Sequence, residues 1–183
     1  MQDSSISNIQ KNPLKLYIQD IFRANSTDNK YVYELFGLPF KNVMIHGVLT
    51  AVYNTTKITT NLELSDATGT VQIYYDSTKN NNSISSTSWR DLTNNYIDAS
   101  KFGDPNILIM SEMMDRIKNK MNCVVFEEGC FMSVVGDIFV DSSRGVRMIS
   151  AYECNVTSAT YDIVWMEELR YLYDKFYISN PSC

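Results

Sequence analysis

The stretch from Val43 to Asp76 constrains the fold most, because it reads as three antiparallel strands in succession. The first run, Val43–Tyr53, is apolar and β-branched around Gly47, and a glycine inside a strand marks a bend, a bulge or the close approach of another backbone. The second run, Lys57–Leu64, alternates apolar and polar side chains, as half-buried strands do. The third, Thr70–Asp76, repeats this alternation. We therefore predict a meander that opens a small β-barrel and has one face in water.

The remaining elements complete a known order. Asp104 and Pro105 are typical of a helix start, and apolar residues recur at helical spacing over 106–121. This helix is expected to plug the barrel. Two more strands follow at Cys130–Asp141 and Val146–Val156, joined by a hairpin with Gly145 in the left-handed region. Three strands, a helix and a hairpin match the five-stranded oligonucleotide/oligosaccharide-binding (OB) barrel. We predict a mainly β, five-stranded OB-fold barrel with a helix between strands three and four and a long C-terminal helix.

The flanking segments carry weaker signals. The polar amino terminus, the Asn/Ser-rich run after Asp76 and the carboxyl terminus have the composition of disordered or loop segments. Residues 13–22 suggest an extended or edge element, and Tyr31–Phe36 a short extended piece within a loop. The expected domains are a disordered arm (1–12), an OB-fold domain (13–158) with a flexible insertion and loop (77–104), a C-terminal partner-binding helix (159–178) and a linker stub (179–183).

Composition narrows the class of protein. The 183 residues carry a net charge of −5, so no global basic field recruits nucleic acid, and a nucleic-acid site has to be local. No apolar stretch is long enough to span a membrane. The four cysteines form no CxxC pair, and the only histidine, His46, is not at ligand spacing to them, which argues against a zinc site.

Enzymatic motifs are also missing from the sequence. It has no GxSxG elbow, P-loop or GxGxxG loop. Glu127-Glu128 and Glu167-Glu168 are adjacent residues whose side chains point apart, so neither pair forms an acid/base dyad. We expect a non-enzymatic protein without a cofactor or metal.

The C-terminal helix, expected over 159–178, is apolar over nearly twice the arc that a surface helix usually buries. One stripe contains Trp165 and a second, beside it, contains Met166. The barrel can cover one stripe, so we expect the other to bind a partner, and large aromatic side chains are common at interface hot spots. The alternative is that the helix lies in a deep groove of its own domain and binds nothing. The sequence does not decide which stripe faces the partner. The candidate partner-binding residues are Tyr161, Trp165, Met166, Leu169, Leu172, Tyr173, Phe176 and Tyr177.

A nucleic-acid site on this fold needs aromatic platforms and cations on the outer face of the second and third strands. This chain offers a thin set there, and an outward tyrosine is also simply a good strand former. The candidates are Tyr53, Lys57, Thr59, Asn61, Gln72, Tyr74, Arg144 and Arg147.

Several short motifs follow one another as in a known family: Tyr17–Ile21 (YIQDI), Val43–Val48 (VMIHGV), Leu64–Thr70 (LSDATGT) and Val134–Gly136 (VVG), before the long terminal helix. Over about residues 14–178 the chain resembles the amino-terminal domain of the middle subunit of the telomeric CST complex, itself similar to the middle subunit of replication protein A. The chain departs from the family pattern at Ser65, where a second acidic residue is common, and in its long insertion after the third strand. Its Asn-, Ser-, Ile- and Tyr-rich composition suits the telomerase-associated ciliate member.

The resemblance implies a nuclear, chromosomal protein at telomeres. Family members pair with a small single-OB third subunit, largely through terminal helices, and join a large OB-containing DNA-binding subunit. Together they bind single-stranded telomeric DNA and regulate telomerase and primase–polymerase α. Members also carry winged-helix domains after the barrel, so 179–183 is expected to begin a linker. Two alternatives stay open: a single-stranded DNA-binding subunit of general replication, and a monomeric barrel that binds a peptide or small ligand.

Overall fold

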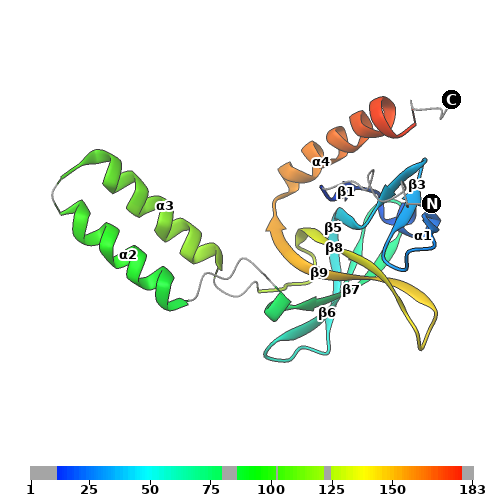
Figure 1. The fold of residues 1–183 in the computed structure, drawn as a ribbon, viewed down its shortest axis with the longest axis horizontal. Coiled ribbons are helices and arrows are strands. Elements are labelled where there is room, and N and C mark those ends of the chain that lie inside the picture. The colour runs from blue at the N-terminus through cyan, green and yellow to red at the C-terminus, as the bar shows by residue number, and fades with distance from the viewer. Residues whose placement is uncertain (1–11, 80–85, 102, 122–124, 179–183) are drawn as a thin grey trace, which may run out of the picture. The chain divides into compact units, whose positions relative to one another are not determined.

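The computed structural model describes residues 12–79, 86–101, 103–121 and 125–178. The chain divides into two compact units: Met1–Lys79 with Phe126–Cys183, and Asn80–Val125. Figure 1 shows the strands of the first unit and the helical pair of the second. The predicted disordered arm, except for Asn12, and the predicted linker stub lie outside the described residues.

The first unit is built on one sheet of six strands in the order β1-β5-β6-β7-β9-β8, and a further pairing of β5 with β8 closes it on itself. Strand β7 runs parallel to β9, and β1 lies parallel to the start of β5. The predicted OB-type strand order is confirmed, although the second strand begins at Thr59, two residues later than expected. The strands are β1 (Leu14–Lys15), β5 (Asn42–Tyr53), β6 (Thr59–Ser65), β7 (Thr70–Asp76), β8 (Phe131–Asp141) and β9 (Val146–Thr157).

The alternation of apolar and polar side chains in β6 and β7 locates the buried core. Leu62 and Leu64 of β6 and Ile73 of β7 are fully buried, while Ile58, expected to face inward, lies before the strand and is exposed. Gly47 marks a close approach of two backbones, because a Cβ added there would lie 2.3 Å from the carbonyl oxygen of Ser65. The barrel therefore requires glycine at this point of β5.

The segment before β5 is more structured than its sequence indicated. After β1 comes a short helix, α1 (Ile18–Arg23), where an extended element was expected. The cause is tertiary: the Asp66 carboxylate accepts a hydrogen bond from the Ile18 amide at 2.9 Å and so satisfies a free N–H of the helix. The predicted loop contains a three-stranded sheet of β2 (Asn25–Ser26), β3 (Tyr33–Leu35) and β4 (Leu38–Phe40).

The second unit is a helical hairpin of α2 (Ser86–Ser100) and α3 (Pro105–Met121). The helix expected over 106–121 is confirmed, but α2 occupies a segment predicted as flexible loop. Of the described side chains in the hairpin, only Thr93 of α2 and Met114 of α3 are buried. The polar sequence of α2 therefore has little apolar periodicity from which a helix could be predicted. The predicted plug role of α3 is wrong, because α3 falls in the second unit and the barrel's hydrophobic cluster takes no described side chain from it.

The last described helix is α4 (Ala159–Leu172), which continues into a π-helical turn, η3 (Tyr173–Tyr177). The predicted long terminal helix is confirmed apart from this turn. Among the described helices, none has the length and apolar character needed to cross a membrane.

Candidate partner interface

Helix α4 begins at a defined cap. Ser158 is extended, and its side-chain oxygen accepts a hydrogen bond from the Tyr161 amide at 3.3 Å. Asp162 follows in the first turn, where a carboxylate favours the positive end of the helix dipole. The helix is thus fixed in register from its first turn, which decides the face that each later side chain occupies.

The inward face of α4 packs against the rest of the first unit. Trp165 and Leu169 are buried. Lys15 of β1 forms an ion pair with Glu168 at 2.6 Å, and its ammonium lies 5.2 Å from the centre of the Trp165 ring. The Tyr177 hydroxyl donates to the Lys15 carbonyl at 3.2 Å. Strand β1 therefore holds both halves of the helix.

Tyr173 adds a polar anchor. Its hydroxyl donates to the carboxylate of buried Asp20 at 2.5 Å and accepts from the Tyr17 amide at 3.3 Å. Burial, as the largest cause, and the hydrogen bond to Asp20, as the second, raise the pKa of Tyr173 well above its ordinary value. The side chain stays a neutral donor throughout the physiological range, and the carboxylate of α1 keeps its partner.

The π-helical turn changes which aromatic ring faces inward. A π turn closes with a bond between residues five apart, so it holds about one residue more than an α turn; here the Ile178 amide donates to the Tyr173 carbonyl at 3.0 Å. Regular helical spacing would put Phe176 in the Trp165 stripe. The extra residue instead buries Tyr177 and leaves Phe176 exposed against Tyr171, with ring centres 5.8 Å apart.

The outward side of α4 and its last turn exposes large apolar side chains beside the charged residues Glu167, Arg170, Asp174 and Lys175. Ile163 is 67 % exposed, Tyr171 58 % and Phe176 51 %. Single exposed apolar residues are ordinary on protein surfaces, but several on one helix indicate an interaction site. We call these residues the outward face of α4: Ile163, Val164, Met166, Tyr171, Phe176 and Ile178.

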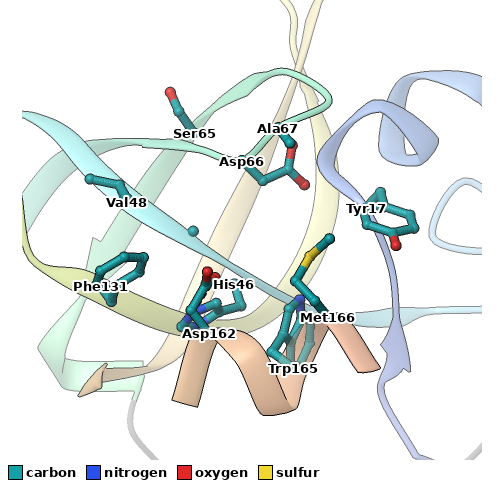
Figure 2. Close-up of a pocket in the computed structure, with 11 residues that line it drawn as sticks. Tyr17, His46, Val48, Ser65, Asp66, Ala67, Phe131, Asp162, Trp165 and Met166 are labelled. Carbon is teal, nitrogen blue, oxygen red and sulfur yellow. Dashed lines mark ion pairs between the residues drawn. The ribbon is translucent and has the colours of Figure 1, made fainter. Parts of the chain in front are cut away.

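A pocket of about 370 Å³ adjoins this face. It lies between the first half of α4, the middle of β5 and the turn between β6 and β7, and Figure 2 shows Met166 extending from α4 toward Asp66 and Tyr17. Its wall is mostly apolar, with aromatic rings from Tyr17, Phe131 and Trp165. Because Met166 belongs to both, the pocket and the outward face form one continuous surface.

His46 closes the floor of the pocket. The imidazole is buried: Nδ1 lies 3.0 Å from the Ser133 hydroxyl, and Nε2 lies 3.3 Å from an Asp162 carboxylate oxygen. Its ring stacks on Phe131 at 6.0 Å. Burial lowers the pKa of His46 below its ordinary value, while Asp162 opposes this shift by attraction. His46 is therefore neutral near pH 7. Nothing in the sequence around His46 predicts its contact with the terminal helix.

The predicted partner residues fall on different sides of α4. Trp165, Leu169 and Tyr177 are buried in the first unit, and Leu172 and Tyr173 pack partly buried against its core. Tyr161 packs edge-on against His46 at 5.3 Å. Met166 and Phe176 lie on the outward face. The periodicity contained both stripes but no information on which one the barrel covers, so Ile163, Val164, Tyr171 and Ile178 were not among the candidates.

The predicted nucleic-acid residues form a partial row. Strand register aligns Tyr53 of β5, Asn61 of β6 and Tyr74 of β7 across the sheet. Gln72 pairs with Glu63 in the next row on this face, and Thr59 pairs with Asp76 on the other side of the first row. Each of these two rows thus brings a carboxylate beside a candidate, which disfavours a polyanion.

The predicted cations are placed unevenly. Lys57 is exposed in the connection between β5 and β6. Arg144 is held by Asp141 at 2.7 Å. Arg147 donates to the backbone carbonyls of Ile21, Phe22 and Ala24 at 2.7–3.0 Å and lies 5.3 Å from the Tyr33 ring centre. Arg147 therefore binds the end of α1. Of the three predicted cations, Lys57 and Arg144 keep exposed side chains.

Among the described residues, no three or more His, Cys, Asp or Glu side chains gather in a way that could hold a metal ion. Cys130 and Cys154 are free thiols, and burial raises the pKa of Cys154. Cys123 and Cys183 lie outside the described residues.

The sequence matches no protein-family model, and no curated protein matches it. Solved structures do resemble it. The Stn1-ten1 complex of S. pombe is 16 % identical with a TM-score of 0.51, covering 90 % of this chain and 93 % of that one. The structure of yeast Stn1 and Ten1 is 10 % identical with a TM-score of 0.54, and the match covers 90 % of this chain and 74 % of that one. A replication protein A heterotrimer bound to single-stranded DNA is 11 % identical with a TM-score of 0.52, and the match covers 86 % of this chain and 91 % of that one. At these identities the likeness establishes the fold, and the fold expected from the family resemblance is confirmed.

Proposed function

We propose that this chain is a non-enzymatic subunit of a telomeric complex resembling replication protein A, and that it forms a heterodimer with a small single-OB protein through the outward face of α4. One observation carries the proposal: α4 is already anchored on its inward side, yet it exposes six large apolar side chains to solvent. A helix that served only to cover the barrel would carry mainly polar side chains there, whereas here the apolar ones outnumber the charged ones.

The pocket extends the proposed interface. It could accept a side chain of the partner next to Met166, since interface hot spots are large side chains that fill such cavities. The structures with this fold that are named above are complexes of OB proteins, which supports a partner of the same kind.

The wider assembly follows from the family resemblance. We propose a nuclear, telomeric location, a large OB-containing DNA-binding subunit as a second partner, and a role in regulating telomerase and C-strand synthesis by primase–polymerase α. Direct contact with single-stranded telomeric DNA is expected to be weak, because two carboxylates lie in the strand rows of the candidate face and the net charge is −5.

The test is light scattering of the purified chain, alone and co-expressed with a small single-OB candidate partner. A one-to-one complex is expected, and Ile163→Glu combined with Tyr171→Ala should dissociate it without altering the melting temperature of the chain alone. Ile58→Glu, which places the same charge on an exposed isoleucine outside α4, is the matched control and should leave the complex intact. A chain that stays monomeric in the presence of the partner refutes the heterodimer.

A second candidate function is single-strand binding in general replication, favoured by the Tyr53–Asn61–Tyr74 row. Stacked bases contribute about 1–3 kcal/mol each, so Tyr53→Ala with Tyr74→Ala should weaken binding of a single-stranded oligonucleotide by at least about tenfold. Fluorescence anisotropy with a G-rich telomeric repeat and with a mixed sequence separates the two functions. Tight binding of both oligonucleotides, lost in the double variant, would favour general replication.

A further inference from the structure

The turn between β3 and β4 contains an unexpected residue. Phe36 and Gly37 are its two central residues, with φ of 54° and 74°, and Leu35 pairs with Leu38 across it. Positive φ at both positions is the type I′ geometry, which favours Asn-Gly. A bulky side chain in this region is strained. The hairpin alone therefore disfavours Phe36, and a contact elsewhere has to compensate.

That contact is with the end of the terminal helix. The Phe36 ring stacks on Tyr177 with centres 6.3 Å apart and planes 16° apart, and meets Tyr173 edge-on at 5.7 Å. Both arrangements are favourable geometries for aromatic pairs. Figure 1 shows β3 near the carboxyl-terminal end of α4. The strained side chain thus reaches the two tyrosines that open and close the π turn.

Those tyrosines decide the register of the turn. Tyr177 occupies the inward position only because the turn holds one extra residue, and its hydroxyl reaches the Lys15 carbonyl. Phe176, which would take this position in a regular α-helix, has no hydroxyl to bond that carbonyl. The Lys15 carbonyl therefore favours Tyr177 over Phe176 at this position, and the Phe36 ring adds a stacking contact to the tyrosine that occupies it.

We infer that Phe36 is a positioning residue: by stacking on Tyr177 it holds the last turn of α4 in the π register and so keeps Phe176 beside Tyr171 on the outward face. The consequence for partner choice rests on the proposed function; the effect on the register does not. Phe36 acts here through Tyr177.

The register is tested first, without a partner, by NMR of the full chain. Phe36→Asn removes the ring and installs a residue that the turn favours, so the hairpin is retained. We expect loss of the nuclear Overhauser effects between the Tyr171 and Phe176 rings and of the slow exchange of the Ile178 amide. Phe36→Tyr, which keeps the ring, should restore both. Tyr31→Ala, an exposed aromatic in the loop before β3, is the control and should change neither.

The partner arm uses the small single-OB protein. Phe36→Asn should weaken its binding about tenfold, because an aromatic hot spot leaves the interface. If Phe36 acts through the position of Phe176, the same change in a Phe176→Ala background should add less than about twofold, since the two effects are then coupled.

Two results overturn the inference. One is a Phe36→Asn variant that keeps the Tyr171–Phe176 contact and the protected Ile178 amide. The other is additive loss of binding in the double variant with an unchanged register, which would make Phe36 a direct contact. If the wild-type chain binds no small OB protein, the proposed function fails, while the NMR result still decides whether Phe36 sets the register.

Discussion

Removing one oxygen atom, with Tyr173→Phe, tests whether α4 is anchored to the barrel by a buried polar bond. The hydroxyl is the hydrogen-bond donor to Asp20, whose residue is 2 % exposed, and the acceptor for the Tyr17 amide. A hydrogen bond to a charged group contributes about 1.5–3 kcal/mol. Among the described residues Arg23 forms an ion pair with this carboxylate at 3.4 Å, but its side chain is largely exposed and can compensate only in part. We expect a loss of about 2–3 kcal/mol in the free energy of unfolding.

The assay is urea denaturation followed by tyrosine and tryptophan fluorescence. Tyr171→Phe is the matched control, since it removes the same atom from an exposed residue two positions earlier and should change stability by less than about 0.5 kcal/mol. If both variants unfold at the same urea concentration with equal slopes, the buried bond contributes nothing to stability and the reasoning is refuted.

The same residue predicts an alkaline effect. The pKa of Tyr173 is raised in the folded state, whereas in the unfolded chain it is about 10. Above that pH the unfolded chain loses a proton that the folded chain retains, so stability falls as pH rises beyond about 10. Tyr173→Phe should make this decline shallower; an unchanged decline would assign it to the other tyrosines.

Three further predictions concern the barrel. The folded-state pKa of His46 is lowered, so stability should fall as pH drops below about 6.5, where the unfolded chain takes up the proton first, and His46→Leu should flatten the melting temperature over pH 5–7; an equal slope in both proteins would show that His46 does not titrate there. Gly47→Ala should cost about 3 kcal/mol by thermal unfolding because its Cβ meets backbone, whereas at Gly69 the nearest atom is 3.7 Å away and alanine should be tolerated. Arg147→Met should destabilise the protein by about 2 kcal/mol in urea, against less than about 0.5 for Arg144→Met, and equal losses would contradict the role of Arg147 at the end of α1.

The sequence predicted the elements whose structure depends on local periodicity. The alternation over β6 and β7, the helical spacing of α3 and α4 and the Gly145 hairpin placed the barrel strands and two helices to within a few residues. It missed the elements that depend on distant residues. Helix α1 is bonded at one end by Asp66 and at the other by Arg147, and nothing in 18–23 indicates either bond.

The candidate interface shows the same limit. Helical spacing identified an apolar arc too wide for one contact, but the side facing the barrel depends on Lys15, Asp20 and Phe36, all more than 120 residues away. The π turn then exchanged Phe176 and Tyr177, which no projection at 100° per residue could show. A single inserted residue was enough to move an aromatic ring from one face to the other.

The two faces of α4 should therefore respond to mutation in different ways. Trp165 is 2 % exposed and in contact with Lys15 and His46, so Trp165→Ala leaves a cavity in the barrel unit and should cost about 3–5 kcal/mol of its own stability. Phe176→Ala removes a half-exposed ring and should spare the fold while weakening a partner. Because the inward bonds hold the helix before any partner arrives, binding need not order it, and the outward face is preorganised. A circular dichroism spectrum of the isolated chain that gains helix on adding the partner would contradict this, since it would mean that the anchors do not hold α4 alone.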